Sequence, residues 1–137
     1  MSERIVRMRS GARFDGRVSS KVGIGYAVGD GSTVTQQTNR TTGVTINKLS
    51  GAITTNNASL AAEATADFVV TNSKVEITDC VVVSQRSGSN GGGTLVSVSA
   101  VAAGSFTIRV HNGNVASGTA ETGAIIINFA VIKGAAS

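Results

Sequence analysis

The sequence predicts an all-β protein, a jelly-roll-like antiparallel β-sandwich of about eight short strands, and three observations indicate this class. The 137 residues include 18 valines, 10 isoleucines and 15 threonines but only 3 leucines, and leucine leads most helical cores. Apolar and polar residues alternate over several short segments. Turns rich in glycine, asparagine and serine separate those segments. The length fits one domain with a single core.

The second half of the chain carries the clearest strand patterns. Phe106, Ile108 and Val110 alternate with polar residues, which predicts one inward and one outward face. The last strand is apolar on both faces except at Asn128. The strands expected here are 79–86, 94–102, 105–111 and 123–133, with a flexible turn at 87–93 and a hairpin-type turn at 112–114.

The first half predicts shorter strands separated by stronger turns. Residues 22–28 alternate Val, Ile, Tyr and Val with glycine and alanine, as a strand does. Residues 56–66 predict one helical turn or an irregular crossover. The other expected strands are 33–38, the hairpin partners 43–47 and 52–55 with a turn at 49–51, and 67–71 with 74–78, either separate or as one bulged strand.

The net charge of +4 lies entirely at the N-terminus. Residues 1–21 carry six basic and two acidic side chains, whereas the remaining residues carry six of each. Large apolar side chains lie among these charges, and disordered tails seldom contain them. We therefore expect a basic, extended N-terminal arm over residues 1–21 that orders on a partner, with a solvated tail as the alternative, and a β domain over residues 22–137. The arm residues expected to bind the partner are Arg4, Ile5, Arg7, Met8, Arg9, Arg13, Phe14 and Arg17.

The side-chain inventory argues against an enzyme. A single His111 and a single Cys80 cannot form a structural zinc site or an internal disulfide, and we expect Cys80 to be reduced and buried. The glycine-rich residues 88–93 lack the Lys-Ser/Thr and the helix of a phosphate loop. We expect no catalytic residues, no cofactor and no metal. Two carboxylate pairs are interpreted as surface charges, Glu63 with Asp67 and Glu76 with Asp79.

Two classes of partner are also disfavoured. The arginines continue to position 17, so the basic start is not followed by the apolar stretch of a secretory signal, and no run is long enough to span a bilayer as a helix. We therefore expect no membrane partner. Arginines in the arm could contact phosphate, but such contacts are not sequence-specific, so we expect no specific nucleic-acid partner.

The last strand predicts self-association. In a two-sheet sandwich each strand has one inner and one outer face, so one apolar face of this strand must lie outside. We expect Ile126, Ala130 and Ile132 to form an exposed stripe that a second copy covers, with cover by the arm or a loop as the alternative. A closed, symmetric homodimer is expected in preference to a trimer.

Three stretches resemble small structural proteins of tailed bacteriophages: residues 33–51 (TVTQQTNRTTGVTINKLSG), 101–109 (VAAGSFTIR) and 125–133 (IIINFAVIK). They are spread between positions 33 and 133, and the arm lies outside them. Proteins of this kind include jelly-roll cement, or decoration, proteins on the outside of icosahedral heads. The resemblance implies a protein without catalytic activity that oligomerises on the capsid and bridges neighbouring major capsid proteins.

The expected function is therefore that of a virion structural protein, a capsid cement protein. It would be made in the host cytoplasm and would lie on the outer surface of the capsid, with the major capsid protein and itself as partners. The alternative is a tail or fibre component that binds host surface glycan or protein.

Overall fold

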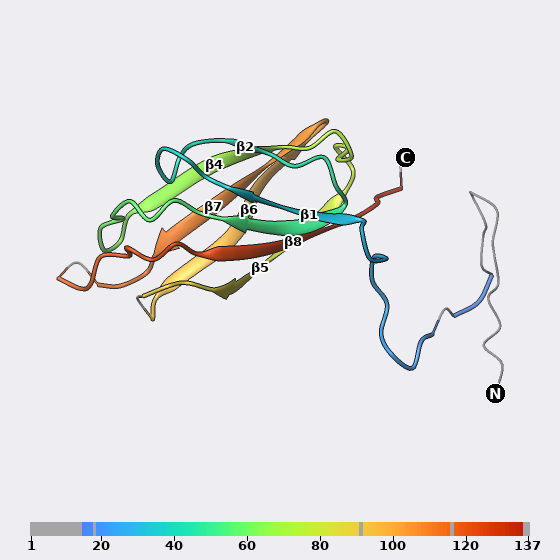
Figure 1. Ribbon diagram of the computed structural model, residues 1–137, viewed down its shortest axis with the longest axis horizontal. Coiled ribbons are helices and arrows are strands. Elements are labelled where there is room, and N and C mark those ends of the chain that lie inside the picture. Colours follow the sequence, from blue (N-terminus) through green and yellow to red (C-terminus); the bar gives the residue numbers. More distant parts are fainter. Residues whose placement is uncertain (1–14, 18, 91, 116, 136–137) are drawn as a thin grey trace.

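The computed structural model describes residues 15–17, 19–90, 92–115 and 117–135, and these form a β-sandwich (Figure 1). Eight strands lie in two four-stranded sheets, and the described part of the chain contains no helix, which confirms the predicted all-β class. The strands are β1 (Gly31–Thr35), β2 (Val44–Thr45), β3 (Ser50–Thr54), β4 (Thr65–Thr71), β5 (Cys80–Ser87), β6 (Thr94–Ala102), β7 (Ser105–Asn112) and β8 (Ile126–Ile132).

The chain crosses between the two sheets at almost every connection. One sheet has the order β1-β3-β8-β5 and the other β2-β4-β7-β6, so β6 and β7 are the only consecutive strands that pair with each other in the described residues. Four ladders are antiparallel, as predicted. The antiparallel prediction is wrong for β1–β3 and β2–β4, which are parallel. Along the chain, the two strands of each parallel pair are separated by one strand of the opposite sheet. The chain therefore re-enters the first sheet in its original direction.

The predicted hairpin of residues 43–47 and 52–55 is wrong, because β2 and β3 belong to different sheets. Ser50 and Gly51 do not form a turn but begin β3. The preceding residues are held by other segments: the Asn72 side chain donates to the Lys48 carbonyl at 2.7 Å, and the Val131 amide donates to the Leu49 carbonyl at 2.8 Å. Long-range hydrogen bonds therefore decide the path here.

Other local predictions differ at the irregular segments. Residues 22–28 and 74–78 are not strands. Residues 56–64 form an irregular crossover, which was one of the two alternatives predicted for residues 56–66, and β4 begins at Thr65. Leu60 within that crossover makes an isolated bridge to Glu121. The turn at 112–114 does not close a hairpin, because β7 and β8 lie in opposite sheets. In contrast, the strands expected at 79–86, 94–102, 105–111 and 123–133 are confirmed as β5 to β8, with small differences at their ends.

The core lies between the sheets and consists mainly of branched aliphatic side chains with three phenylalanines, Phe68, Phe106 and Phe129. Phe106 of β7 and Phe129 of β8 meet across the sandwich with ring centroids 5.4 Å apart and planes tilted by 49°. The predicted inward faces of β7 and β8 are confirmed. Their buried side chains are Phe106, Ile108 and Val110 on β7, and Ile127, Phe129 and Val131 on β8 with Ile125 just before it.

Gly51 allows β1 and β3 to approach each other closely over the core. A Cβ at this position would meet the Ser32 carbonyl oxygen and would lie 2.8 Å from Cδ1 of Ile46 and 3.0 Å from Cε1 of Phe129. We expect Gly51→Ala to lower the free energy of unfolding by about 1–3 kcal/mol through overpacking. Urea denaturation measures the change. Gly25→Ala is the control, since its Cβ would meet nothing within 4 Å, and an equal effect of both substitutions would contradict the explanation.

Candidate interaction surface

The outer faces of the two sheets differ in charge. On the β2-β4-β7-β6 sheet, Arg109 pairs with Asp67 through hydrogen bonds of 2.9 and 2.8 Å, and His111 Nδ1 lies 3.1 Å from Thr65 Oγ1. The guanidinium of Arg109 lowers the pKa of Asp67, mainly through its hydrogen bond. This is the polar, solvated outer face that sandwich sheets usually present.

The outer face of the β1-β3-β8-β5 sheet carries only uncharged side chains at its paired positions, and Arg86, unpaired in the bulge near the end of β5, is the one charged residue in these four strands. The strand register places Ala130 between Ser50 and Val82, and Asn128 between Ala52 and Ser84. The neighbours of these residues along each strand point into the core. We call this surface the uncharged face; its residues are Thr33, Thr35, Ser50, Ala52, Thr54, Cys80, Val82, Ser84, Ile126, Asn128, Ala130 and Ile132.

The residues predicted for self-association all belong to the uncharged face. Ile126 and Ala130 are half-buried, and Ile132 is 59% exposed. Val82, next to Ala130 on β5, is 47% exposed and adds to the stripe. The face is therefore broader than the stripe that the sequence of β8 alone indicates. Its small side chains, such as Ser50, Ala52 and Ala130, allow another surface to approach closely.

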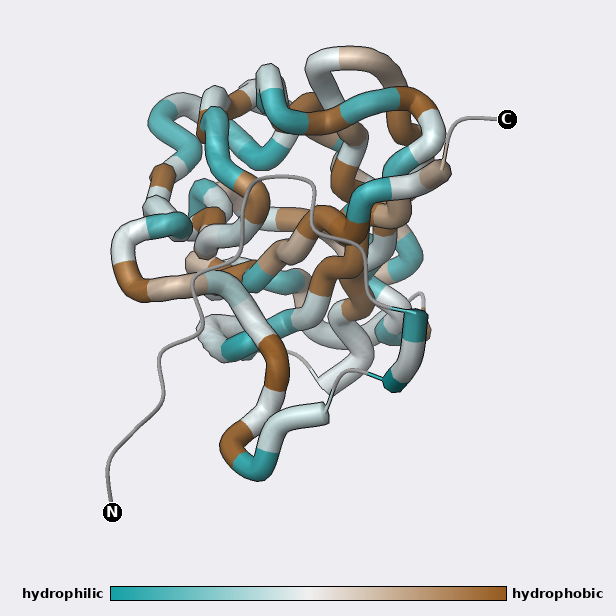
Figure 2. Tube along the Cα trace, turned by 90° about the vertical axis from the view of Figure 1, so that its right-hand side faces the viewer, coloured by the Kyte–Doolittle hydropathy of each residue, from teal (hydrophilic) through white to brown (hydrophobic). Residues whose placement is uncertain are grey.

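A segment before β1 lies beside one end of this face. The Tyr26 hydroxyl donates a hydrogen bond to the Val131 carbonyl, and a gap of about 420 Å³ lies between residues 24–26 and the side chains of Ala130 and Ile132. Most of the segment lies below the sandwich in the view of Figure 2. Its sequence alternates large apolar with small residues. A loop thus approaches the stripe, as in the alternative in which the arm or a loop covers it, but Ile132 remains exposed.

The predicted capsid-binding residues of the arm are mostly outside the part of the chain that the structure describes. Arg17 is described and is exposed. The other seven, outside the described residues, are Arg4, Ile5, Arg7, Met8, Arg9, Arg13 and Phe14.

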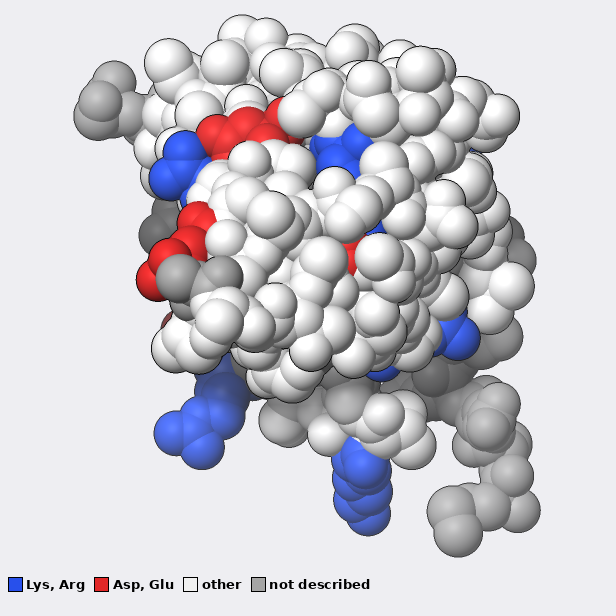
Figure 3. Space-filling model, turned by 90° about the vertical axis from the view of Figure 1, so that its left-hand side faces the viewer, with Lys and Arg blue, Asp and Glu red and all other residues white. Residues whose placement is uncertain are grey.

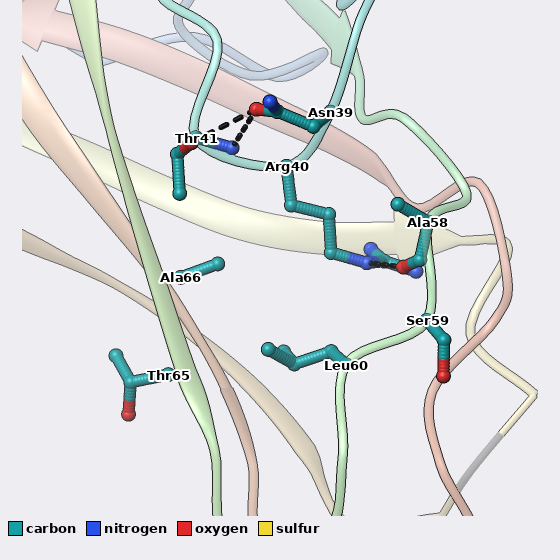
Figure 4. Close-up of a pocket in the computed structure, with 8 residues that line it drawn as sticks. All are labelled: Asn39, Arg40, Thr41, Ala58, Ser59, Leu60, Thr65 and Ala66. Carbon is teal, nitrogen blue, oxygen red and sulfur yellow. Dashed lines mark hydrogen bonds between the residues drawn. The ribbon is translucent and has the colours of Figure 1, made fainter.

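Arg40 fills a buried site at the opposite end of the sandwich (Figure 4). Its Nε donates to the Ala58 carbonyl at 2.5 Å, and its Nη1 donates to Thr55 Oγ1 at 3.3 Å. Its Nη2 donates to the carbonyls of Glu121 and Gly123 at 3.2 and 2.8 Å. Burial lowers the pKa of Arg40, and the charge of Glu121 opposes that shift. The guanidinium therefore joins its own loop to two other segments, residues 55–58 and 121–123.

Glu121 is the acidic partner in this region and has no exposed surface. Its carboxylate accepts hydrogen bonds from the Ser89 and Thr94 hydroxyls at 2.5 Å, and from the Asn90 and Gly123 amides at 3.1 and 2.7 Å. Burial alone would raise the pKa of Glu121, but these hydrogen bonds outweigh it and lower the pKa to about 2. The carboxylate is therefore charged at neutral pH and joins the loop between β5 and β6, and the first residue of β6, to the segment that leads into β8.

This end of the molecule also has a shallow pocket of about 230 Å³ beside Arg40 and Leu60. Its polar groups are largely bonded within the protein, since the Asn39 side-chain oxygen accepts from the Thr41 amide and hydroxyl at 2.9 and 2.8 Å. The polar groups at the pocket wall are thus mostly hydrogen-bonded to other groups of the protein. Charged atoms on this end form small groups separated by broad uncharged surface (Figure 3).

Sequence reasoning missed Arg40 and Glu121. Each is a single charge within a long uncharged stretch: Arg40 between Asp30 and Lys48, and Glu121 between Arg109 and Lys133. Isolation in the sequence does not mark them as buried, because Arg86 is similarly isolated between Asp79 and Arg109 and is exposed. Their pairing across 81 positions could not be read from the sequence.

Two sequence interpretations are corrected near β5. Cys80, expected to be buried, is exposed because it lies on the outer side of the edge strand, opposite Ile132. Asp79, expected to be a surface charge, is buried: it accepts from Lys133 Nζ at 2.6 Å and from the amides of Glu76 and Gly134 at 2.8 and 3.0 Å. The Lys133 hydrogen bond is the largest cause that lowers the pKa of Asp79. This clamp fixes the end of β8 beside the start of β5.

In the described residues no three His, Cys, Asp or Glu side chains form a group that could hold a metal ion. The same residues include no helix that is long and apolar enough to cross a membrane. No protein-family model, no curated protein and no solved structure matches the chain.

Proposed function

We propose that this protein is a virion structural protein, a cement or decoration protein that binds the outside of an icosahedral phage head and bridges major capsid protein subunits. The observation that carries the proposal is the uncharged face, which offers a surface without charges at its paired positions for contact with another protein and lies in a chain whose net charge is confined to residues 1–21. Its apolar part, Val82 with Ile126, Ala130 and Ile132, forms an exposed apolar patch of the kind that often marks an interaction site.

The proposal includes a jelly-roll interpretation of the sandwich. The last strand, β8, lies between β3 and β5, and β7 lies between β4 and β6. Consecutive strands from β3 to β6 alternate between the sheets, as they do in a jelly roll. In this interpretation β1 and β2 are additional parallel strands at the two opposite edges.

The two surfaces would have separate tasks on the particle. The arginines of the arm would pair with carboxylates of the capsid subunits, while Ile5, Met8 and Phe14 would fill apolar recesses between them. Ile126, Ala130 and Ile132 would join two copies into a homodimer. Because the protein would bind only the assembled shell, it would stabilise that shell by mass action, and its many copies would make weak contacts add up.

Deleting residues 1–21 is expected to abolish binding to heads and to leave the β domain folded, because all eight strands begin at or after Gly31. Full-length and truncated proteins are mixed with heads from a phage that lacks the gene, the heads are pelleted, and the bound protein is quantified. Circular dichroism checks the fold of the truncated chain.

A charge-preserving variant is the matched control. Replacing the five arm arginines with lysine is expected to retain most binding, whereas replacing them with glutamate is expected to abolish it. Equal occupancy of heads by full-length and truncated protein would refute the role of the arm. Binding of the full-length chain to isolated tails instead of heads would refute the cement proposal in favour of a tail or fibre component.

A further inference from the structure

We propose that residues 22–28 form an additional β-strand on the free edge of β5 in a second copy of this chain. The proposal concerns how copies join each other, and it does not depend on where the protein binds the virion. Three observations carry it: an unpaired segment with the pattern of a strand, an unprotected sheet edge, and a core that is open at that edge.

The unpaired segment has a regular alternation of large apolar and small residues, VGIGYAV. Val22 and Val28 are almost fully exposed and Ile24 is 76% exposed, although these are side chains that a soluble domain usually buries. In the described structure this segment belongs to no strand ladder. Its one side-chain hydrogen bond to the sandwich is that of Tyr26 to Val131, and a single bond of this type is worth about 1 kcal/mol.

One free edge of the β1-β3-β8-β5 sheet belongs to β5. This strand pairs with β8 on one side and is the last strand of its sheet. Edge strands are usually protected by charges, prolines or bulges. The first five residues of β5, CVVVS, have none of these, and the bulge lies at the far end between Gln85 and Ser87. Such an edge is open to strand addition, in which backbone hydrogen bonds supply the affinity.

The core is also incompletely covered along this edge. Val83 of β5 and Val96, Val98 and Val101 of β6 pack against the core but are only partly buried, whereas the inward residues of β7 and β8 are almost fully buried. A strand added to β5 with its large side chains inward would cover these valines. Its glycines and alanine would then continue the outer row of Cys80, Val82 and Ser84, which belongs to the uncharged face.

The length of the connection requires a second copy. In the sheet order β1-β3-β8-β5, the edge of β5 lies three strand spacings from β1, roughly 14 Å. Val28 is three residues before Gly31, the first residue of β1, and three residues span at most about 11 Å. The segment therefore cannot lie along β5 of its own chain. The edge of another copy has no such restriction.

Cross-linking between differently tagged chains tests the pairing. One chain carries Cys80→Ser with Gly25→Cys or Ala27→Cys, and the other retains its native Cys80, the only cysteine of the chain. A short bismaleimide is expected to give a heterodimer of the two tags, because residues 25 and 27 would lie on the same side of the added strand as Cys80. The control chain carries Cys80→Ser with Thr107→Cys, on the opposite outer face, and is expected to give no heterodimer.

Sedimentation velocity gives an independent measurement. Ile24→Asp is expected to weaken self-association at least about tenfold, because it places a charge on the inward side of the added strand. Val115→Asp is the matched control, since Val115 is 72% exposed and belongs to a distant connection. A native chain that stays monomeric at 100 µM, equal self-association of both variants, or no heterodimer at position 25 or 27 would each overturn the proposal.

Discussion

Replacing Arg40 with methionine is expected to lower the free energy of unfolding by about 3–5 kcal/mol, the usual cost of removing one partner of a buried charged pair. Methionine fills similar space but has no donors. The carbonyls of Ala58, Glu121 and Gly123 would each lose a hydrogen bond, and the buried carboxylate of Glu121 would lose its neighbouring positive charge. Because a domain of this size has a total stability of about 5–15 kcal/mol, the loss would be a large fraction.

Guanidinium chloride denaturation at pH 7 measures this effect, and two variants make it specific. Arg40→Lys keeps the charge but offers fewer, differently placed donors, so we expect an intermediate loss. Arg109→Met removes an arginine from the exposed pair with Asp67, and such pairs contribute at most about 1 kcal/mol. If Arg40→Met were no more destabilising than Arg109→Met, the network around Arg40 would not be a main source of stability.

The network also bears on the proposed contacts. It joins the crossover before β4 and the loop between β5 and β6 to the segment that leads into β8. The Asp79–Lys133 clamp fixes the other end of β8. The central strand of the uncharged face is thus fixed at both ends by charged groups that lie off the face. The face itself can remain uncharged because the polar contacts that hold it are at its two ends.

The regular part of the fold could be predicted because its strands carry their own pattern. In β7, Phe106, Ile108 and Val110 alternate with polar residues, and the structure buries all three. The same is true of the inner face of β8. Residues 22–28 have an equally good pattern and are not a strand. Alternation shows that a segment can pair, but the partner strand must come from elsewhere, and in the described structure this segment forms no ladder even with β1, the edge strand that follows it.

The topology and the wider site could not be predicted, because both depend on which strands become neighbours. The polar turn at 49–51 predicted a hairpin, but contacts with Asn72 and Val131 direct the chain into the opposite sheet. Ile126, Ala130 and Ile132 could be selected from their strand alone. The rest of the uncharged face depends on β3 and β5 lying on either side of β8, which no local pattern indicates.

Acidification is expected to destabilise the protein through Glu121, between about pH 5 and pH 2. The carboxylate has an ordinary pKa of 4.5 in the unfolded chain and a pKa of about 2 in the folded protein. A group with a depressed folded pKa contributes stability above its unfolded pKa, and that contribution is lost as the pH falls toward the folded value. A difference of this size corresponds to about 3 kcal/mol, of which about 2 kcal/mol is lost by pH 3.

Urea denaturation at pH 6 and pH 3 measures the loss, and Glu121→Gln isolates its source. Glutamine cannot titrate, so the variant is less stable at pH 6 but should lose about 2 kcal/mol less than the native chain on acidification. Asp67 and Asp79 also have lowered pKa values, so both proteins retain a smaller acid sensitivity of the same sign. Equal losses in both proteins would show that the Glu121 carboxylate is not held in its charged form by Ser89, Thr94 and the two backbone amides.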